Sequence, residues 1–249
     1  LLKKNIQISL SEIIIYSGKN RPLDLAYLNP MSSHLEIEYN KRANNPYLDS
    51  GNALWQLSFD SIFNNRLRFS FNYLIDELTL DDSQFKDGKV NGVAYSMRFA
   101  WTEVVKTYIV TYKLSIIHVG SLTFKHEDGY NNFVLRGLPL GWEYGSDGDQ
   151  LTLGTKFFNK KNLIVKANFS KVRFGSKSIL QNPYLPYDIY SASTFPSGQI
   201  SYLDYLETVV DYFISEKLTI SCSYKFEQLN GIKNNKLRLS INLFNDFIF

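Results

Sequence analysis

KLRLSINLFNDFIF, residues Lys236 to Phe249, alternates apolar and polar side chains to the last residue of the sequence. Counting back from the end in twos gives one apolar set, interrupted by Asn245, that comprises Phe249, Phe247, Leu243, Ile241, Leu239 and Leu237. Because side chains alternate across a β-strand, this pattern predicts a strand with one apolar face. Two interpretations stay open from this stretch alone: a strand that faces lipid, and an edge strand of a soluble sheet.

The same period of two recurs along the chain, which predicts an all-β protein with about ten antiparallel strands, most of a length suited to crossing a bilayer. The earlier segments are Asn5 to Tyr16, Ala53 to Ile62, Leu67 to Glu77, Val93 to Thr102, Thr107 to His118, Gln150 to Phe158, Leu163 to Phe174, Ile200 to Phe213 and Leu218 to Glu227. Between the first two segments the period is lost. There, residues 31–40 predict a short helix that Asn29 and Pro30 introduce.

The connections between these segments are predicted to alternate strictly between short turns and long loops. The last of them, LNGIKNNK at residues 229–236, counts as a loop. A soluble sandwich has no reason to separate its connections in this way. Outer-membrane barrels place short turns on one side of the membrane and long loops on the other. Because an open sheet edge in lipid leaves backbone groups unpaired, such a sheet must close. The sequence therefore predicts an antiparallel transmembrane β-barrel, in which residues 1–249 form a single domain lacking its N-terminal part.

Composition narrows the class of protein further. Aromatic residues make up 15% of the 249 residues, including 18 Phe and 17 Tyr, and these side chains favour sheets and membrane interfaces. The net charge of +3 is too small to predict a nucleic-acid partner. No run of about 18 apolar residues predicts a membrane-spanning helix. The single cysteine, Cys222, excludes an internal disulfide.

The end of the sequence resembles the C-terminal signature of Gram-negative outer-membrane β-barrels, a final aromatic residue preceded by apolar residues at alternate positions. This resemblance implies an outer-membrane location and contact with membrane lipid. It also implies that the barrel-insertion machinery recognises the C-terminal strand through Phe249.

Three stretches together resemble the C-terminal part of the capsule assembly Wzi family of outer-membrane proteins, with similar strand spacing over most of the chain. The third of them is the terminal strand. The first carries Gly18, Arg21, Pro22, Tyr27, Asn29 and Pro30. The second carries Arg136, Gly137, Pro139, Leu140, Gly141 and Asp149. The resemblance implies a surface lectin that holds capsular polysaccharide or another exopolysaccharide for capsule attachment or assembly, and no enzymatic activity.

Candidate saccharide-binding residues lie in the predicted loops. Aromatic faces stack on sugar rings and Tyr hydroxyls hydrogen-bond to them, and arginine pairs with acidic sugars. We therefore predict a polysaccharide-binding set of Arg21, Tyr130, Arg136, Trp142, Tyr144 and Tyr187. A structural role is the alternative for each of these residues. The aromatic residues could pack within the loops or form an interfacial belt. The arginines could form ion pairs, and for Arg136 the partner would be Asp147 or Asp149.

Other functions have weaker support in the sequence. The three histidines, His34, His118 and His126, lack the spacing of a metal site, and no nucleophile motif accompanies them. We expect no catalytic residue, no metal and no cofactor. The principal alternative function is an outer-membrane channel or transporter for small solutes.

Overall fold

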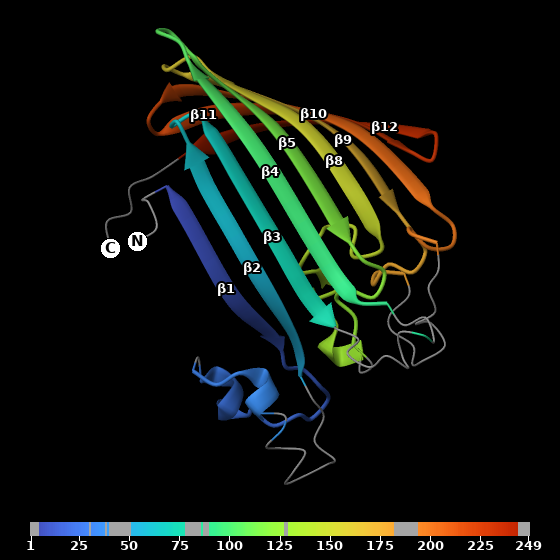
Figure 1. Cartoon of the computed structure of the whole chain (residues 1–249). Helices are drawn as coiled ribbons and strands as arrows, with labels where there is room; N and C mark the ends of the chain where they lie inside the picture. The colour runs from blue at the N-terminus through green and yellow to red at the C-terminus, as the bar shows by residue number, and fades with distance from the viewer. Residues whose placement is uncertain are drawn as a thin grey trace.

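The computed structural model describes residues 5–29, 31–37, 39, 51–77, 86, 90–126, 129–181 and 194–243. Ten strands form one antiparallel sheet in the order β1-β2-β3-β4-β5-β8-β9-β10-β11-β12 (Figure 1). Their bounds are β1 Ile6–Ile15, β2 Asn52–Phe63, β3 Leu67–Glu77, β4 Gly92–Val104, β5 Ile109–Val119, β8 Gly148–Phe158, β9 Leu163–Phe174, β10 Ser201–Ser215, β11 Leu218–Leu229 and β12 Ile232–Leu243. A two-stranded ribbon, β6 Val134–Leu135 with β7 Leu138–Pro139, lies outside this sheet.

The ten predicted strands are confirmed, and each pairs with its neighbour in the chain. The largest difference is at β12, which begins at Ile232, whereas the alternation predicts a start at Lys236. Asn230 and Gly231 form a tight turn with φ of 48° and 86°, so the predicted loop 229–236 is wrong. The predicted strict alternation of short turns and long loops therefore fails at this last connection. Asn-Gly is a strong hairpin pair because both positions of a type I′ turn need positive φ. Residues 34–37 are helical, as predicted, and a 3₁₀ turn, η1 Leu25–Leu28, precedes them.

The two faces of the sheet differ in chemistry as the alternation predicts. Residues that are directly opposite each other on paired strands share a face of the sheet. One face, which we call the outer face, carries rows of large apolar side chains such as Phe59, Phe69 and Phe99. The ring centroids lie 6.0 Å apart for Phe59 and Phe69 and 4.7 Å apart for Phe69 and Phe99. The opposite, inner face carries hydrogen-bonded polar rows, such as Thr152 with Ser170 across β8 and β9.

The sheet curves strongly, and the long connections gather at one end of it, toward the bottom of Figure 1. The predicted closure is not formed by the described strands, because β1 and β12 are the two edges of the sheet and do not pair with each other. Within the described residues, no helix has the length and apolarity needed to cross a membrane. Residues 244–249, including Phe249, lie outside the described residues.

The core lies between the inner face and the long connection from β5 to β8. Phe124, Phe133 and Trp142 of this connection are buried against inner-face side chains at the loop end of the strands. Those strand residues are Leu54, Ala94, Val119, Val172 and Leu203. A second connection contributes Ile179, which is also buried in the cluster. This packing holds the two long connections against the inner face of the sheet.

Candidate functional site

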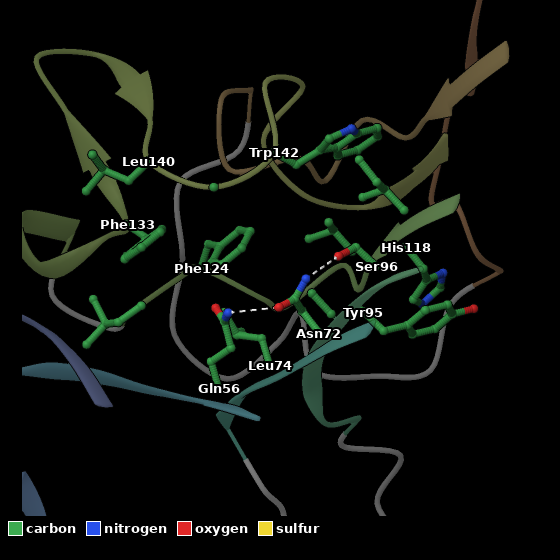
Figure 2. A pocket seen from close by; sticks show the side chains of 15 residues that line it. Gln56, Asn72, Leu74, Tyr95, Ser96, His118, Phe124, Phe133, Leu140 and Trp142 are labelled. Carbon is green, nitrogen blue, oxygen red and sulfur yellow. Dashed lines mark hydrogen bonds between the residues drawn. The ribbon is translucent and has the colours of Figure 1, made fainter. Parts of the chain in front are cut away.

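A pocket of about 320 Å³ lies between the inner face and the β5–β8 connection (Figure 2). Strands β1 to β5 form one wall of it, and Phe124, Phe133, Leu140, Gly141 and Trp142 supply the other wall. Its volume is within the range of small-molecule sites. It lies at the end of the sheet where the long connections gather, so we take it as the candidate binding site.

Three polar side chains from neighbouring strands form a connected row in the pocket wall. Gln56 Nε2 donates to Asn72 Oδ1 at 3.3 Å, and Asn72 Nδ2 donates to Ser96 Oγ at 3.1 Å (Figure 2). Each amide also keeps capacity for a further hydrogen bond. The row therefore offers donors and acceptors in a fixed arrangement, which suits a ligand with several hydroxyl groups.

Aromatic side chains from the β5–β8 connection face this polar row. The rings of Phe124 and Phe133 are stacked with centroids 5.1 Å apart, and Trp142 completes the wall. A Cβ atom at Gly141 would lie 2.6 Å from Phe124 Cζ, so only glycine permits this approach. The wall thus combines flat apolar surfaces with the opposing amides, a combination that binds sugar rings.

The predicted residue Trp142 lines the pocket, and its position is fixed from behind. Only 6% of its surface is exposed, and its Nε1 donates to Gln150 Oε1 at 2.8 Å. Tyr144 contacts Trp142 edge-on with centroids 5.2 Å apart and stacks on Phe174 at 5.5 Å. Burial raises the pKa of the Tyr144 hydroxyl well above its usual range. Tyr144 therefore supports Trp142 from outside the pocket lining.

The other predicted residues do not line the pocket. Arg21 lies over the Tyr16 ring at 3.7 Å and donates to Ser17 O at 2.9 Å and Asn131 Oδ1 at 3.3 Å, so it joins the β1–β2 connection to the β5–β8 connection. Tyr130 is 59% exposed on the η2 turn, Gly129–Asn131. Arg136 has a positive φ of 52° and forms, with Gly137, the exposed turn of the β6–β7 ribbon. Tyr187 lies outside the described residues.

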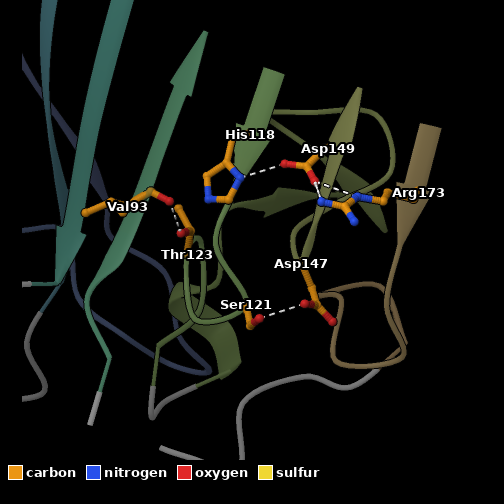
Figure 3. Close-up of polar contacts among 7 residues, drawn as sticks. All are labelled: Val93, His118, Ser121, Thr123, Asp147, Asp149 and Arg173. Atoms are coloured by element: carbon orange, nitrogen blue, oxygen red, sulfur yellow. Dashed lines mark hydrogen bonds and ion pairs between the residues drawn. The ribbon is translucent and has the colours of Figure 1, made fainter. Parts of the chain in front are cut away.

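The carboxylates considered as partners of Arg136 bind other groups (Figure 3). Asp149 Oδ1 lies 2.6 Å from His118 Nδ1, and Asp149 Oδ2 lies 2.6 Å from Arg173 Nη2. Asp147 accepts from Ser121 Oγ at 2.6 Å. The predicted ion pair of Arg136 with Asp147 or Asp149 is therefore wrong, because both carboxylates bind other groups. The hydroxyl of Ser121 donates to Asp147 and not to His118.

A buried lysine lies beside this polar group. Lys125 is buried, and its Nζ donates to the carbonyl oxygen of Lys177. Burial lowers the pKa of Lys125 to about 8, against the opposing effect of the nearby Asp147 carboxylate. Among the described side chains, no group of three or more His, Cys, Asp or Glu residues is arranged to hold a metal ion.

Comparison with known proteins identifies the architecture. No family model and no curated protein matches the sequence. The sheet has a fold similar to Wzi. The solved structure of Wzi from Escherichia coli is described as a carbohydrate-binding β-barrel, an outer-membrane protein involved in group 1 capsule assembly. The match has a TM-score of 0.65 at 12% identity and covers 95% of this chain and 47% of Wzi. The chain thus spans about half the length of Wzi, and the similarity establishes a Wzi-like fold.

Sequence reasoning missed the polar half of the pocket. The alternation predicts only that Gln56, Asn72 and Ser96 lie among the polar residues of three strands. These residues lie on three different strands, so only the strand register brings them together. Asn72 lies directly opposite Ser96, and Gln56 lies two positions before Ser58, the residue directly opposite Asn72. The available signal was their shared parity near the loop end of adjacent strands.

Proposed function

We propose that this chain is the carbohydrate-binding part of an outer-membrane β-barrel of the Wzi family, holding capsular polysaccharide or another exopolysaccharide at the cell surface. The observation that carries the proposal is the pocket, where Gln56, Asn72 and Ser96 face the rings of Phe124, Phe133 and Trp142. Amides satisfy sugar hydroxyls while the rings cover apolar sugar faces. The carbohydrate-binding description of Wzi, a protein of similar fold, supports the same ligand class.

The membrane part of the proposal is supported by the outer face. Large apolar side chains remain exposed there on strand after strand, including Leu10, Trp101, Leu153 and Leu206. An exposed apolar surface of this extent is rare on soluble monomers and suits contact with lipid. In this arrangement, the long connections and the pocket lie together at the extracellular end.

The protein acts in this proposal as a lectin without catalysis. The His118–Asp149 pair resembles two members of a hydrolase triad, but the hydroxyl of Ser121 is directed to Asp147. Incubation with the bound polysaccharide should therefore release no new reducing ends. Release of oligosaccharides by the purified protein would contradict this part of the proposal.

Asn72→Ala tests the pocket directly. The substitution removes the central amide of the polar row, and we expect the affinity for the producing organism's purified surface polysaccharide to fall about tenfold. The matched control is Thr102→Ala, which removes a hydroxyl that lies 3.0 Å from Thr111 Oγ1 on the same face, outside the pocket lining. Binding is measured by titration calorimetry in detergent micelles. Equal affinities for Asn72→Ala and the unaltered protein would refute the pocket as the saccharide site.

A further inference from the structure

Four basic side chains gather on the inner face beyond the pocket, toward the short-turn end of the sheet. This cationic cluster contains one residue from each of four neighbouring strands: Arg98 of β4, Lys113 of β5, Lys156 of β8 and Lys166 of β9. Arg98 follows the pocket residue Ser96 by two positions on the same face, a separation of about 7 Å along the strand. The cluster therefore begins where the wall of the pocket ends.

The register brings these like charges together. Lys156 and Lys166 are directly opposite each other in the β8–β9 pairing, an arrangement that destabilises a sheet. Lys113 extends across Gly154: a Cβ atom there would lie 3.0 Å from Lys113 Cε. Gly154 therefore provides the space that lets Lys113 approach β9, and Lys113 is repelled by the three other members of the cluster.

Carboxylates compensate only part of this charge. Asp211 Oδ2 lies 3.0 Å from Lys166 Nζ, and Glu207 shares the face, opposite Lys225 in the β10–β11 pairing. Within the described part of the chain, no carboxylate lies within ion-pair distance of the other three members, Arg98, Lys113 and Lys156. A face with several uncompensated positive charges attracts anionic ligands.

We propose that the cationic cluster binds the acidic groups, in the first instance carboxylates, of a saccharide whose sugar rings lie in the adjoining pocket. This assignment rests on the proposed function and narrows its ligand to an acidic polysaccharide. Arg98, nearest the pocket, offers a planar fork that matches a carboxylate, and the lysines act as point charges farther along the face. The repulsion among the four cations is relieved when the anionic ligand binds.

Two probes separate the anion site from the saccharide site. Tripolyphosphate tests the cluster alone, and oligogalacturonate is compared with the same oligomer after reduction of its carboxyl groups. We expect both anionic probes to bind the purified chain in micelles at low salt, and the acidic oligomer to bind at least about tenfold more tightly than its reduced form. The double variant Lys113→Gln/Lys156→Gln should bind tripolyphosphate at least about tenfold more weakly and lose the preference for the acidic oligomer.

The control is Lys171→Gln, which also removes one positive charge. Lys171 is exposed on the outer face of β9, opposite Asp204 of β10. This substitution should change neither the affinity for tripolyphosphate nor the preference for the acidic oligomer. Failure of tripolyphosphate to bind would overturn the cluster as an anion site, whatever the reduced oligomer does. Equal binding of the acidic and reduced oligomers would overturn the acidic assignment while leaving the proposed lectin function intact. Absence of binding by the reduced oligomer and the polysaccharide would instead overturn the lectin function.

Stability of the unliganded protein provides a second readout, which separates a binding role from a structural one. Because Lys156 lies opposite Lys166, Lys156→Gln should raise resistance to urea while it weakens anion binding. A variant that loses both stability and anion binding would identify the cluster as a structural element and overturn the proposal.

Discussion

Asp147 joins two long connections, β5–β8 and β9–β10, through one buried carboxylate. Its oxygens accept hydrogen bonds from Ser121 Oγ at 2.6 Å, from Lys177 N at 3.2 Å and from Ser197 N at 3.0 Å. The side chain is fully buried, and the backbone has a positive φ of 64°. Ser121 belongs to the β5–β8 connection, whereas Lys177 and Ser197 belong to two parts of the β9–β10 connection. The carboxylate therefore holds the β9–β10 connection to the β5–β8 connection, which supplies one wall of the pocket.

Asp147→Asn should lower the free energy of unfolding by about 3 kcal/mol, because the amide nitrogen cannot accept the hydrogen bonds that the carboxylate accepts. Asparagine tolerates a positive φ as aspartate does, so the change isolates the charge and the acceptor. The measurement is urea unfolding in micelles, together with hydrogen exchange of the Ser197 amide. Asp60→Asn is the control: its partner Arg68 is largely exposed, and the loss should stay below about 1 kcal/mol. A similar loss in both variants would contradict this role of Asp147.

Single residues of the site were only partly predictable. Trp142 is one of the predicted saccharide-binding residues and lines the pocket, and it also packs in the core, the structural role that competes in the sequence. Arg21, in contrast, lies over the Tyr16 ring and donates a hydrogen bond to Asn131. Asn131 is more than a hundred positions away from Arg21 in the sequence. Local patterns carry no information on such long-range contacts, so the structural role of Arg21 stayed one of two alternatives.

The β11–β12 hairpin depends on a two-residue turn. Gly231 has a φ of 86°, and Asn230 also fixes the neighbouring strand, because its Oδ1 accepts from Tyr202 N at 2.8 Å. Gly231→Ala should destabilise the protein by about 1–2 kcal/mol, since a Cβ is unfavourable at this left-handed φ. Gly129→Ala is the control and should stay within about 0.5 kcal/mol. Gly129 lacks a positive φ, and the nearest atom to an added Cβ would be Asn132 Nδ2 at 4.0 Å, an ordinary contact. Equal urea midpoints for the two variants would argue against the strained turn.

Elements were predicted better than their connections. β3 and β9 begin and end where the alternation of Leu67 to Glu77 and Leu163 to Phe174 begins and ends. The alternation fails at Ile232–Asn235 because these residues, IKNN, are mostly polar on both faces of an edge strand. The β5–β8 connection was predicted only as a long loop, since its fold depends on burial of Phe124 and Phe133 against distant strands.

The whole molecule has two opposite surfaces on one sheet. The outer face exposes apolar rows, and the inner face carries the polar pocket and the cationic cluster. The alternation predicted this separation directly, because a period of two assigns every side chain to a face. Closure into a barrel does not follow from the alternation, and the two edges of the described sheet, β1 and β12, are not paired with each other. The chain spans about half of Wzi.

Adjacent substitutions in the middle of β2 distinguish lipid from water as the surroundings of the outer face. Leu57 points outward and is 45% exposed, whereas Ser58 points inward, opposite Asn72. In water, a lysine at exposed position 57 is harmless, but at the centre of a bilayer it costs about 2–4 kcal/mol. Leu57→Lys should therefore reduce the folded fraction recovered in lipid vesicles, while Ser58→Lys, which adds the same charge to the polar face, should retain it. Equal recovery of the two variants would show that the outer face does not contact lipid, and would leave the apolar rows to be covered by another protein surface.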